Sequence, residues 1–184
     1  MTLSDSPQLA TVPVELDNPE DWNDIAKQLA AVSGLPGTIT PELLTMTVGS
    51  AVSILFTADR SGDADILRGT FTEQVMNQRR QFPGSLDGDT PVSVMLHLVG
   101  APVREGKPVI RVHLVVATRS ADGGSGANSQ FWDFTVDTQV VVGQATCTNC
   151  GAPIPEGRLV CDHCHTDVRQ VVSAPLVVSR LELY

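Results

Sequence analysis

The 184-residue sequence has little positive charge, few aromatic side chains and no long hydrophobic run. A membrane-spanning helix needs about 20 apolar residues, so the absence of a long uncharged apolar run argues against a transmembrane protein. The first residues, MTLSDSPQLA, have neither the basic region nor the apolar region of a signal peptide. We therefore expect a cytoplasmic protein.

Basic residues are outnumbered by acidic residues, 12 to 21, and the formal net charge is −9. Proteins that bind nucleic acid need clustered basic side chains to neutralise phosphates, so nucleic-acid partners are disfavoured. The same imbalance weakens contact with anionic lipid headgroups, and a peripheral membrane role is disfavoured too. Proteins remain the expected partners, and a homo-oligomer is compatible with the sequence.

Short motifs of common enzyme classes are missing as well. The sequence has no glycine-rich phosphate loop, no G-x-S-x-G and no H-E-x-x-H. We predict a protein that is not an enzyme. The alternative is a small-molecule-binding or catalytic domain that uses a pocket histidine, and its candidate residues are His97, His113, Asp133, Asp137 and Arg111.

Two patterns weaken that catalytic alternative. If the turn R-E-G-K is symmetric, residues whose numbers add to about 211 pair across it, which places His97 opposite Leu114. His113 then lies on the other face of the sheet from His97. Asp133 and Asp137 alternate with apolar residues, the pattern of a strand with one face in water.

Helix signals occupy the first half of the chain. A tail over 1–17 has no clear period and is expected to be flexible, and an Asn–Pro pair then opens an amphipathic helix over about 18–34. A Thr–Pro pair opens a longer helix over about 41–60, which is apolar on most of its surface and must be buried on several sides. A short helical turn at 65–68 follows. The run T-F-T-E has capping-box spacing and predicts a polar helix that ends near Gln81.

Strand signals occupy the second half, where the hydrophobic period changes from about 3.6 to 2. A glycine-rich segment, ADGGSGANS, is expected to be a flexible loop between the second and third strands. Helices followed by strands predict an α+β fold with helices packed on one face of an antiparallel sheet. The predicted strands are 92–103, 107–120, 129–142 and 173–184.

Four cysteines form two C-x-x-C pairs, Cys147 with Cys150 and Cys161 with Cys164. A reducing cytoplasm disfavours disulfides, so the four are expected to be thiolate ligands of a metal ion. Each pair in a tight turn supplies two sulfur ligands for tetrahedral zinc, and Gly151 relieves the backbone after the first pair. The surroundings suggest no redox role, so zinc is favoured over iron.

A site with four protein ligands has no open position for water or substrate, so the zinc ion is predicted to be structural. His163 and His165 leave one alternative open, because either could replace a cysteine as a metal ligand or contact the ligands without binding the metal. The simpler interpretation is that both histidine side chains face water beside the cysteine turns. The segment around the cysteines carries no basic cluster, which argues against a nucleic-acid-binding ribbon.

Several runs together resemble a known family. The segments DADILRGTFTEQVMNQRRQ, FWDFTVD, ATCTNCGAP…CDHC and LVVSRLELY cover about residues 40–184. They are similar to the bacterial, zinc-ribbon-bearing branch of the domain named for subunit forty-four of the mitochondrial inner-membrane import motor, within the nuclear-transport-factor-two-like superfamily. The four cysteines match that branch position for position. The third strand is longer than in those relatives, and the last strand lacks their tryptophan.

The resemblance implies a cone-shaped α+β fold, in which a curved sheet wraps a helix pair around an apolar pocket. It also implies a function, because relatives include scaffolds, membrane tethers that bind proteins, and a minority of small-molecule enzymes. We expect a tail and short helix over 1–36 and a cone-like domain over 37–184, interrupted by a zinc ribbon over 145–168. The predicted function is a non-enzymatic protein-binding or scaffolding module, transport-related or part of a larger assembly. Its partner would bind at the Trp22 helix, the pocket or the ribbon.

Overall fold

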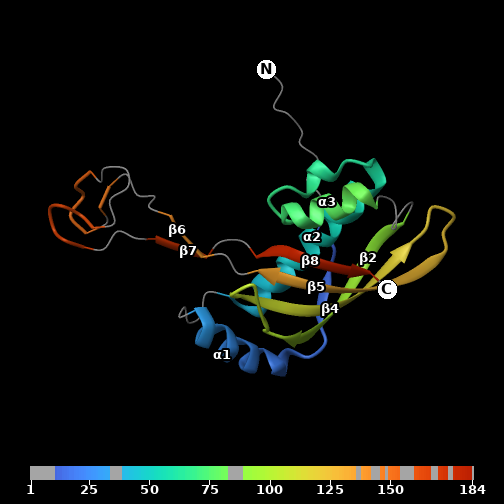
Figure 1. Cartoon of the computed structure of the whole chain (residues 1–184), viewed down its shortest axis with the longest axis horizontal. Helices are drawn as coiled ribbons and strands as arrows, with labels where there is room; N and C mark the ends of the chain where they lie inside the picture. The colour runs from blue at the N-terminus through green and yellow to red at the C-terminus, as the bar shows by residue number, and fades with distance from the viewer. Residues whose placement is uncertain are drawn as a thin grey trace, which may run out of the picture. The chain divides into compact units, whose positions relative to one another are not determined.

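A computed structural model describes residues 11–33, 39–82, 89–135, 138–141, 146–147, 149–153, 160–166, 170–173 and 176–183. The chain divides into two compact units. We call Met1–Val136 with Pro175–Tyr184 the sheet unit, and Asp137–Ala174 the cysteine unit. Figure 1 shows the elements of both.

Helix α2, Pro41–Ser61, is the central helix of the sheet unit. It begins as predicted, because the Thr40 hydroxyl accepts a hydrogen bond from the Leu43 amide and Pro41 occupies the first turn. It ends at Gly62, whose φ of 68° suits glycine. By length and composition α2 is able to cross a membrane, but here most of its apolar residues pack in the core, although Met46 is exposed.

The first helical segment begins at Pro19 as predicted, but its first turn is 3-10 and the α-helix starts only at Trp22. A 3-10 turn, Pro19–Asp21, leads into α1, Trp22–Ser33, and Asn18 makes no capping bond. Instead, the Asn18 side chain pairs with both backbone groups of Leu98: its oxygen accepts from the Leu98 amide at 2.8 Å and its nitrogen donates to the Leu98 carbonyl at 3.1 Å. Asn18 therefore ties the start of this segment to the sheet.

The sheet of this unit has six strands in the order β1-β2-β4-β5-β8, and β3 pairs with β4. The strands β1 and β2 pair in parallel and the other neighbours are antiparallel, so the α+β class is confirmed but the sheet is mixed. The segment 1–17, which was predicted to be a flexible tail, contains β1. The Val94 amide donates to the Pro13 carbonyl at 2.9 Å and so holds this segment on β2. The strands are β1 Val14–Leu16, β2 Thr90–Gly100, β3 Val103–Arg104, β4 Lys107–Arg119, β5 Ser125–Thr135 and β8 Val177–Leu183.

The predicted register between β2 and β4 is wrong. Gly100 pairs with Arg111 as the symmetric turn requires, but an irregularity between Leu98 and Gly100 shifts the pairing by one residue. Beyond this bulge His97 lies directly opposite His113, so both histidines face the same side. A bulge inserts one residue into a strand, and the alternating pattern does not reveal it.

Two predicted boundaries also change. The loop between β4 and β5 is short, because Ser120 and Gly124 close a tight turn and β5 already begins at Ser125. The predicted helical turn forms as a 3-10 helix, Ala64–Leu67, and the polar helix as α3, Glu73–Gln81.

The predicted capping box does not form before α3, because residues 70–72 are used by the sheet. The Thr70 carbonyl accepts from the Val178 amide, and the Thr72 amide donates to the Val178 carbonyl, both at 2.9 Å. Thr72 is the N-cap residue, without a side-chain capping bond. The start of α3 is thereby attached to β8.

The two faces of the sheet differ. One face packs against α1 and α2 and contributes fully buried side chains, including Trp132, Phe134 and Leu114. On the other face most side chains remain half-buried or exposed, as on the alternate positions of β4. This second face carries the histidines and most of the arginines discussed below.

In the cysteine unit, β6, Thr138–Val141, pairs with β7, Gln170–Ser173, as an antiparallel two-stranded sheet. The four cysteines lie between these strands in sequence. The predicted strand 129–142 is therefore two strands, with β5 in one unit and β6 in the other. The predicted last strand corresponds to β8, Val177–Leu183, whereas β7 precedes it and was not predicted.

Candidate metal centre

The structure brings the four predicted metal ligands together. One sulfur atom from each of Cys147, Cys150, Cys161 and Cys164 lies within 4.8 Å of all the others. The Sγ atoms of Cys147 and Cys164 are 3.5 Å apart, and those of Cys150 and Cys161 are 3.6 Å apart. Cys147 and Cys161 are buried, Cys164 is half-buried and Cys150 is exposed. None forms a disulfide.

The two cysteine turns have the same backbone design. After the first pair, the Gly151 amide donates to the Cys147 carbonyl at 2.8 Å; after the second, the His165 amide donates to the Cys161 carbonyl at 2.9 Å. Both residues are left-handed, with φ of 70° at Gly151 and 57° at His165. The predicted role of Gly151 is confirmed, and His165 takes the same conformation without the freedom of glycine.

A second hydrogen bond closes each turn. The Cys147 amide donates to the Ala152 carbonyl at 2.8 Å, and the Cys161 amide donates to the Thr166 carbonyl at 2.9 Å. These bonds fix the backbone on both sides of each cysteine pair. The positions of the sulfur atoms are therefore set by the local turns.

Both histidines beside the second pair are exposed, and neither belongs to the cluster of close ligand atoms. His163 lies between two ligands in sequence, and His165 contributes its backbone amide to the turn. The ligand set in this structure consists of sulfur atoms alone.

The sulfur atoms lie in unequal electrostatic surroundings. Hydrogen bonds from the Thr166 hydroxyl, the Thr166 backbone and the Asn149 side chain lower the pKa of Cys164 to about 5. At Cys150 the backbone of Ala152 lowers the pKa, but hydrogen bonds with the other thiols and desolvation outweigh it and raise the pKa to about 12. Cys164 therefore loses its proton at a lower pH than Cys150 does.

The donor set suits a tetrahedral, thiophilic metal ion. Four thiolates fill a tetrahedral shell and leave no coordination position for water. A metal ion bound here would be held by protein alone, and its positive charge would stabilise all four thiolates. The arrangement can support folding, whereas it offers a substrate no direct contact with the metal.

His97 and His113 are brought together, contrary to the prediction that they lie on opposite faces. Their rings stack with centroids 5.5 Å apart, and His113 also stacks on Phe131 at 4.6 Å. The Nδ1 atom of His97 lies 2.9 Å from an Asp17 carboxylate oxygen, and Nε2 of His113 lies 2.8 Å from the Ser129 hydroxyl. Desolvation and the neighbouring His97 lower the pKa of His113. The pair lies on the sheet face opposite the helix-packed core.

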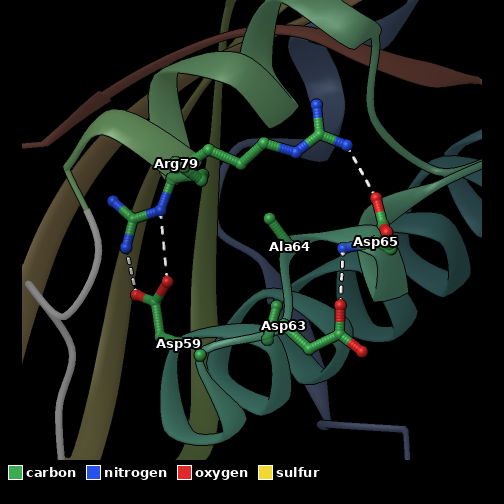
Figure 2. A pocket seen from close by; sticks show the side chains of 8 residues that line it. Asp59, Asp63, Ala64, Asp65 and Arg79 are labelled. Carbon is green, nitrogen blue, oxygen red and sulfur yellow. Dashed lines mark hydrogen bonds and ion pairs between the residues drawn. The ribbon is translucent and has the colours of Figure 1, made fainter.

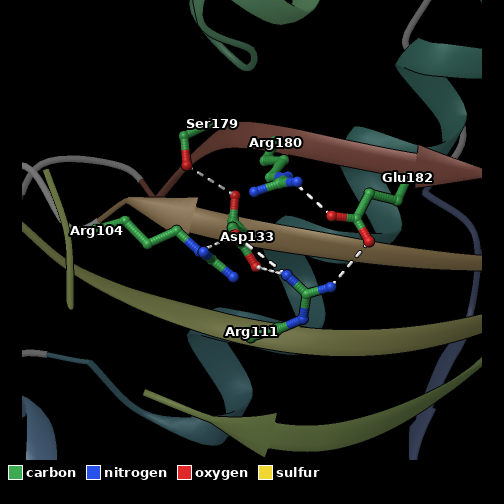
Figure 3. A network of polar contacts seen from close by, with 6 residues as sticks. All are labelled: Arg104, Arg111, Asp133, Ser179, Arg180 and Glu182. Carbon is green, nitrogen blue, oxygen red and sulfur yellow. Dashed lines mark hydrogen bonds and ion pairs between the residues drawn. The ribbon is translucent and has the colours of Figure 1, made fainter. Parts of the chain in front are cut away.

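Asp133 lies on the solvent-facing side of the sheet, as the alternating pattern predicted, but its side chain is not in water. Its side chain is only 1% exposed, because Arg111 and Arg104 cover it. Figure 3 shows these side chains over β4, β5 and β8. The pattern identifies the face of the strand correctly but does not reveal the arginines that bury the carboxylate. Asp137, the other predicted acid, lies outside the described residues.

A pocket of about 300 Å³ lies where α2 ends and α3 passes, and the sequence did not predict it. The resemblance implies an apolar pocket, but charged side chains line much of this one: Asp59, Asp63, Asp65, Arg79 and Arg80. Figure 2 shows the Arg79 guanidinium facing the Asp59 carboxylate; this ion pair is buried, and Arg79 Nε lies 3.2 Å from Asp59 Oδ1. None of the predicted acid–base residues that the structure describes lines this pocket. In the sequence, this pocket could have been inferred from Asp59, a carboxylate within the largely apolar helix α2.

Comparison with known proteins gives no family or relative for this chain: no family model, curated protein or solved structure matches it.

Proposed function

We propose that the four cysteines hold one zinc ion in a closed structural site, and that the chain acts as a non-enzymatic binding or scaffolding module. The observation that carries the proposal is the convergence of four sulfur atoms within 4.8 Å from two matched turns. Four thiolates favour zinc among the common divalent ions that lack redox chemistry. The ion would hold the cysteine unit in its folded form.

Binding is favoured over catalysis because the predicted acid–base side chains are engaged in other contacts. Asp133 is neutralised by arginines, and His97 is paired with Asp17. The face of the sheet that packs against the helices is filled by side chains such as Trp132 and Leu114. A catalytic role for these residues would require them to leave contacts that stabilise the sheet.

The proposal keeps the import-motor resemblance, the cone fold and the cytoplasmic location as parts that remain to be tested. Within it, the cysteine unit is the preferred surface for a protein partner. Trp22 is half-buried and packs against the core of its own unit, which leaves less of its ring for a partner. A role inside a larger assembly, transport-related or otherwise, follows from the resemblance alone.

The metal proposal is tested by elemental analysis of the purified full chain. We expect about one zinc per chain, and loss of zinc in Cys150→Ser and in Cys161→Ser because each removes one ligand. His163→Gln and His165→Asn are matched controls beside the ligands, and both should retain zinc. Iron in place of zinc, or full zinc content in both cysteine variants, would refute the assignment.

The binding proposal needs a separate experiment. A partner captured by the zinc-loaded chain should be lost with Cys161→Ser and kept with Trp22→Ala if the cysteine unit forms the contact. The opposite result would assign the contact to the Trp22 helix. Substrate turnover that disappears on chelation and returns with zinc would contradict a non-enzymatic function.

A further inference from the structure

Three arginines converge on two carboxylates on the sheet face that lies away from α2 (Figure 3). Arg111, Asp133 and Arg180 are direct neighbours across β4, β5 and β8, and Glu182 lies two residues beyond Arg180 on the same strand. Arg104 reaches the same carboxylate from β3. Strand pairing therefore places charges that are far apart in sequence around one point.

Arg111 is the centre of the network. One of its terminal nitrogens, Nη1, donates to Asp133 Oδ1 at 3.1 Å, and the other, Nη2, donates to Glu182 Oε2 at 2.9 Å. Its guanidinium carbon also lies 5.2 Å from the centre of the Phe131 ring. Arg111 thus holds the two carboxylates and lies over the aromatic ring.

Arg104 and Arg180 contribute in a different way. Each approaches a carboxylate through Nε: Arg104 lies 2.7 Å from Asp133 Oδ2 and Arg180 lies 2.8 Å from Glu182 Oε1. The Arg104 contact is an ion pair without hydrogen-bond alignment, because its buried Nε finds no acceptor in line. Within the described part of the chain, no hydrogen bond from the terminal nitrogens of either arginine accompanies these Nε contacts.

Among the described residues, three guanidinium groups face two carboxylates, which leaves one positive charge over in a chain whose net charge is −9. The two outer arginines hold this excess near solvent, since the Arg104 side chain is 39% exposed and that of Arg180 is 52% exposed. A network that served only to bury Asp133 would need no third arginine. The terminal N–H donors of Arg104 and Arg180 and the excess positive charge both suit a negatively charged ligand.

We propose that Arg104 and Arg180 form a binding site for a singly charged oxyanion, either a carboxylate or a phosphate diester. Guanidinium groups suit this ligand because two parallel N–H donors match two oxygen atoms. Asp133 and Glu182 hold the two arginines through Nε and leave their terminal nitrogens for the ligand. One negative charge on the ligand makes the site electrically neutral.

The test is a titration of the isotope-labelled, zinc-loaded full chain followed by NMR of the arginine side-chain signals. Acetate and dimethyl phosphate are the two probes, each added at constant ionic strength against chloride. We expect saturable shifts of the Arg104 and Arg180 signals, and the probe that saturates at lower concentration identifies the ligand class. Loss of a charge-assisted hydrogen bond should weaken binding by about tenfold or more in Arg104→Gln and in Arg180→Gln.

Arg119→Gln is the matched control, because Arg119 is an exposed arginine on the same strand as Arg111 but outside the network. It should bind both probes like the wild type. Arg104→Lys should bind both probes more weakly than the wild type, because lysine keeps the positive charge but lacks the two parallel N–H donors of a guanidinium group. Melting temperatures check that the variants are folded. Linear, unsaturated shifts with both probes, or equal binding by Arg104→Gln and wild type, would overturn the proposal. The site does not depend on zinc, so Cys161→Ser should still bind the probes.

Discussion

The two units of the chain are stabilised by different means. The sheet unit buries a continuous core in which Trp132, Phe56 and Leu55 are almost completely removed from solvent. Among the described residues of the cysteine unit, the buried side chains are those of Cys147 and Cys161, with Ala152 and Cys164 packed against them. We expect the first unit, with its larger apolar burial, to fold by itself, and under the proposed function the second depends on the metal ion that its sulfur atoms bind.

This difference follows from size. A unit of fewer than about 40 residues rarely buries enough apolar surface to offset its loss of conformational entropy, so it needs a metal ion, disulfides or a partner. Under the proposed function, the sheet unit should tolerate loss of the metal, and the cysteine unit should tolerate damage to the sheet core. The predictions below separate the two kinds of stability.

The largest effect is expected in the sheet core. Trp132→Ala removes a fully buried ring, whose Nε1 donates to the Gln130 side chain at 2.7 Å, and should lower the free energy of unfolding by about 3–5 kcal/mol. Denaturant titration followed by circular dichroism measures it, with Val99→Ala as an exposed control on β2. The zinc content should not change, and loss of zinc in Trp132→Ala would show that the units are not independent.

The buried ion pair should have the next largest effect. Asp59→Asn leaves Arg79 charged and buried between α2 and α3, which should cost about 3 kcal/mol of stability. Asp65→Asn breaks the exposed ion pairs with Arg80 and Arg68 at the same pocket and should change stability little. Equal melting temperatures for the two variants would contradict the importance of burial.

A smaller effect is expected at the first helix. Trp22→Ala removes a half-buried ring that packs on the core and should destabilise the sheet unit by about 1–2 kcal/mol. Thermal unfolding by circular dichroism measures the change. An unchanged melting temperature would instead favour Trp22 as a residue kept for a partner.

The smallest effect concerns pH. Because burial and His97 hold the pKa of His113 below its usual 6.5, the unfolded chain takes up this proton at a higher pH than the folded chain does. Stability of the sheet unit should therefore fall as the pH drops through about 6.5, and this contribution is absent above it. The loss should be smaller in His113→Gln than in wild type when melting temperatures are compared between pH 7.5 and 5. Identical pH profiles would contradict the shift.

Features encoded by neighbouring residues were predictable from sequence. The start of α2 follows from Thr40 and Pro41, and the ligand set follows from two C-x-x-C pairs whose turns form locally. The α+β class follows from the change of hydrophobic period along the chain. Each of these signals is complete within a few adjacent residues.

Features that depend on distant contacts were missed. The strand β1 is three residues long and carries no period, so only its pairing with β2 reveals it. The bulge before Gly100 shifts a register that turn symmetry alone cannot determine. Asp133 is buried by arginines that the alternating pattern does not show, and Asp59 on α2 pairs with Arg79 on α3, a residue twenty positions away in sequence.

The central claim is that a metal ion folds the cysteine unit while the sheet unit folds without it. Amide hydrogen exchange, measured residue by residue with and without a zinc chelator, tests this most directly. We predict that chelation removes protection from the cysteine-turn amides of Gly151 and His165, and leaves the amides of β4 and β5 as protected as before. Unchanged protection at both turns after the zinc is shown to be gone, or loss of protection throughout the sheet, would contradict the claim.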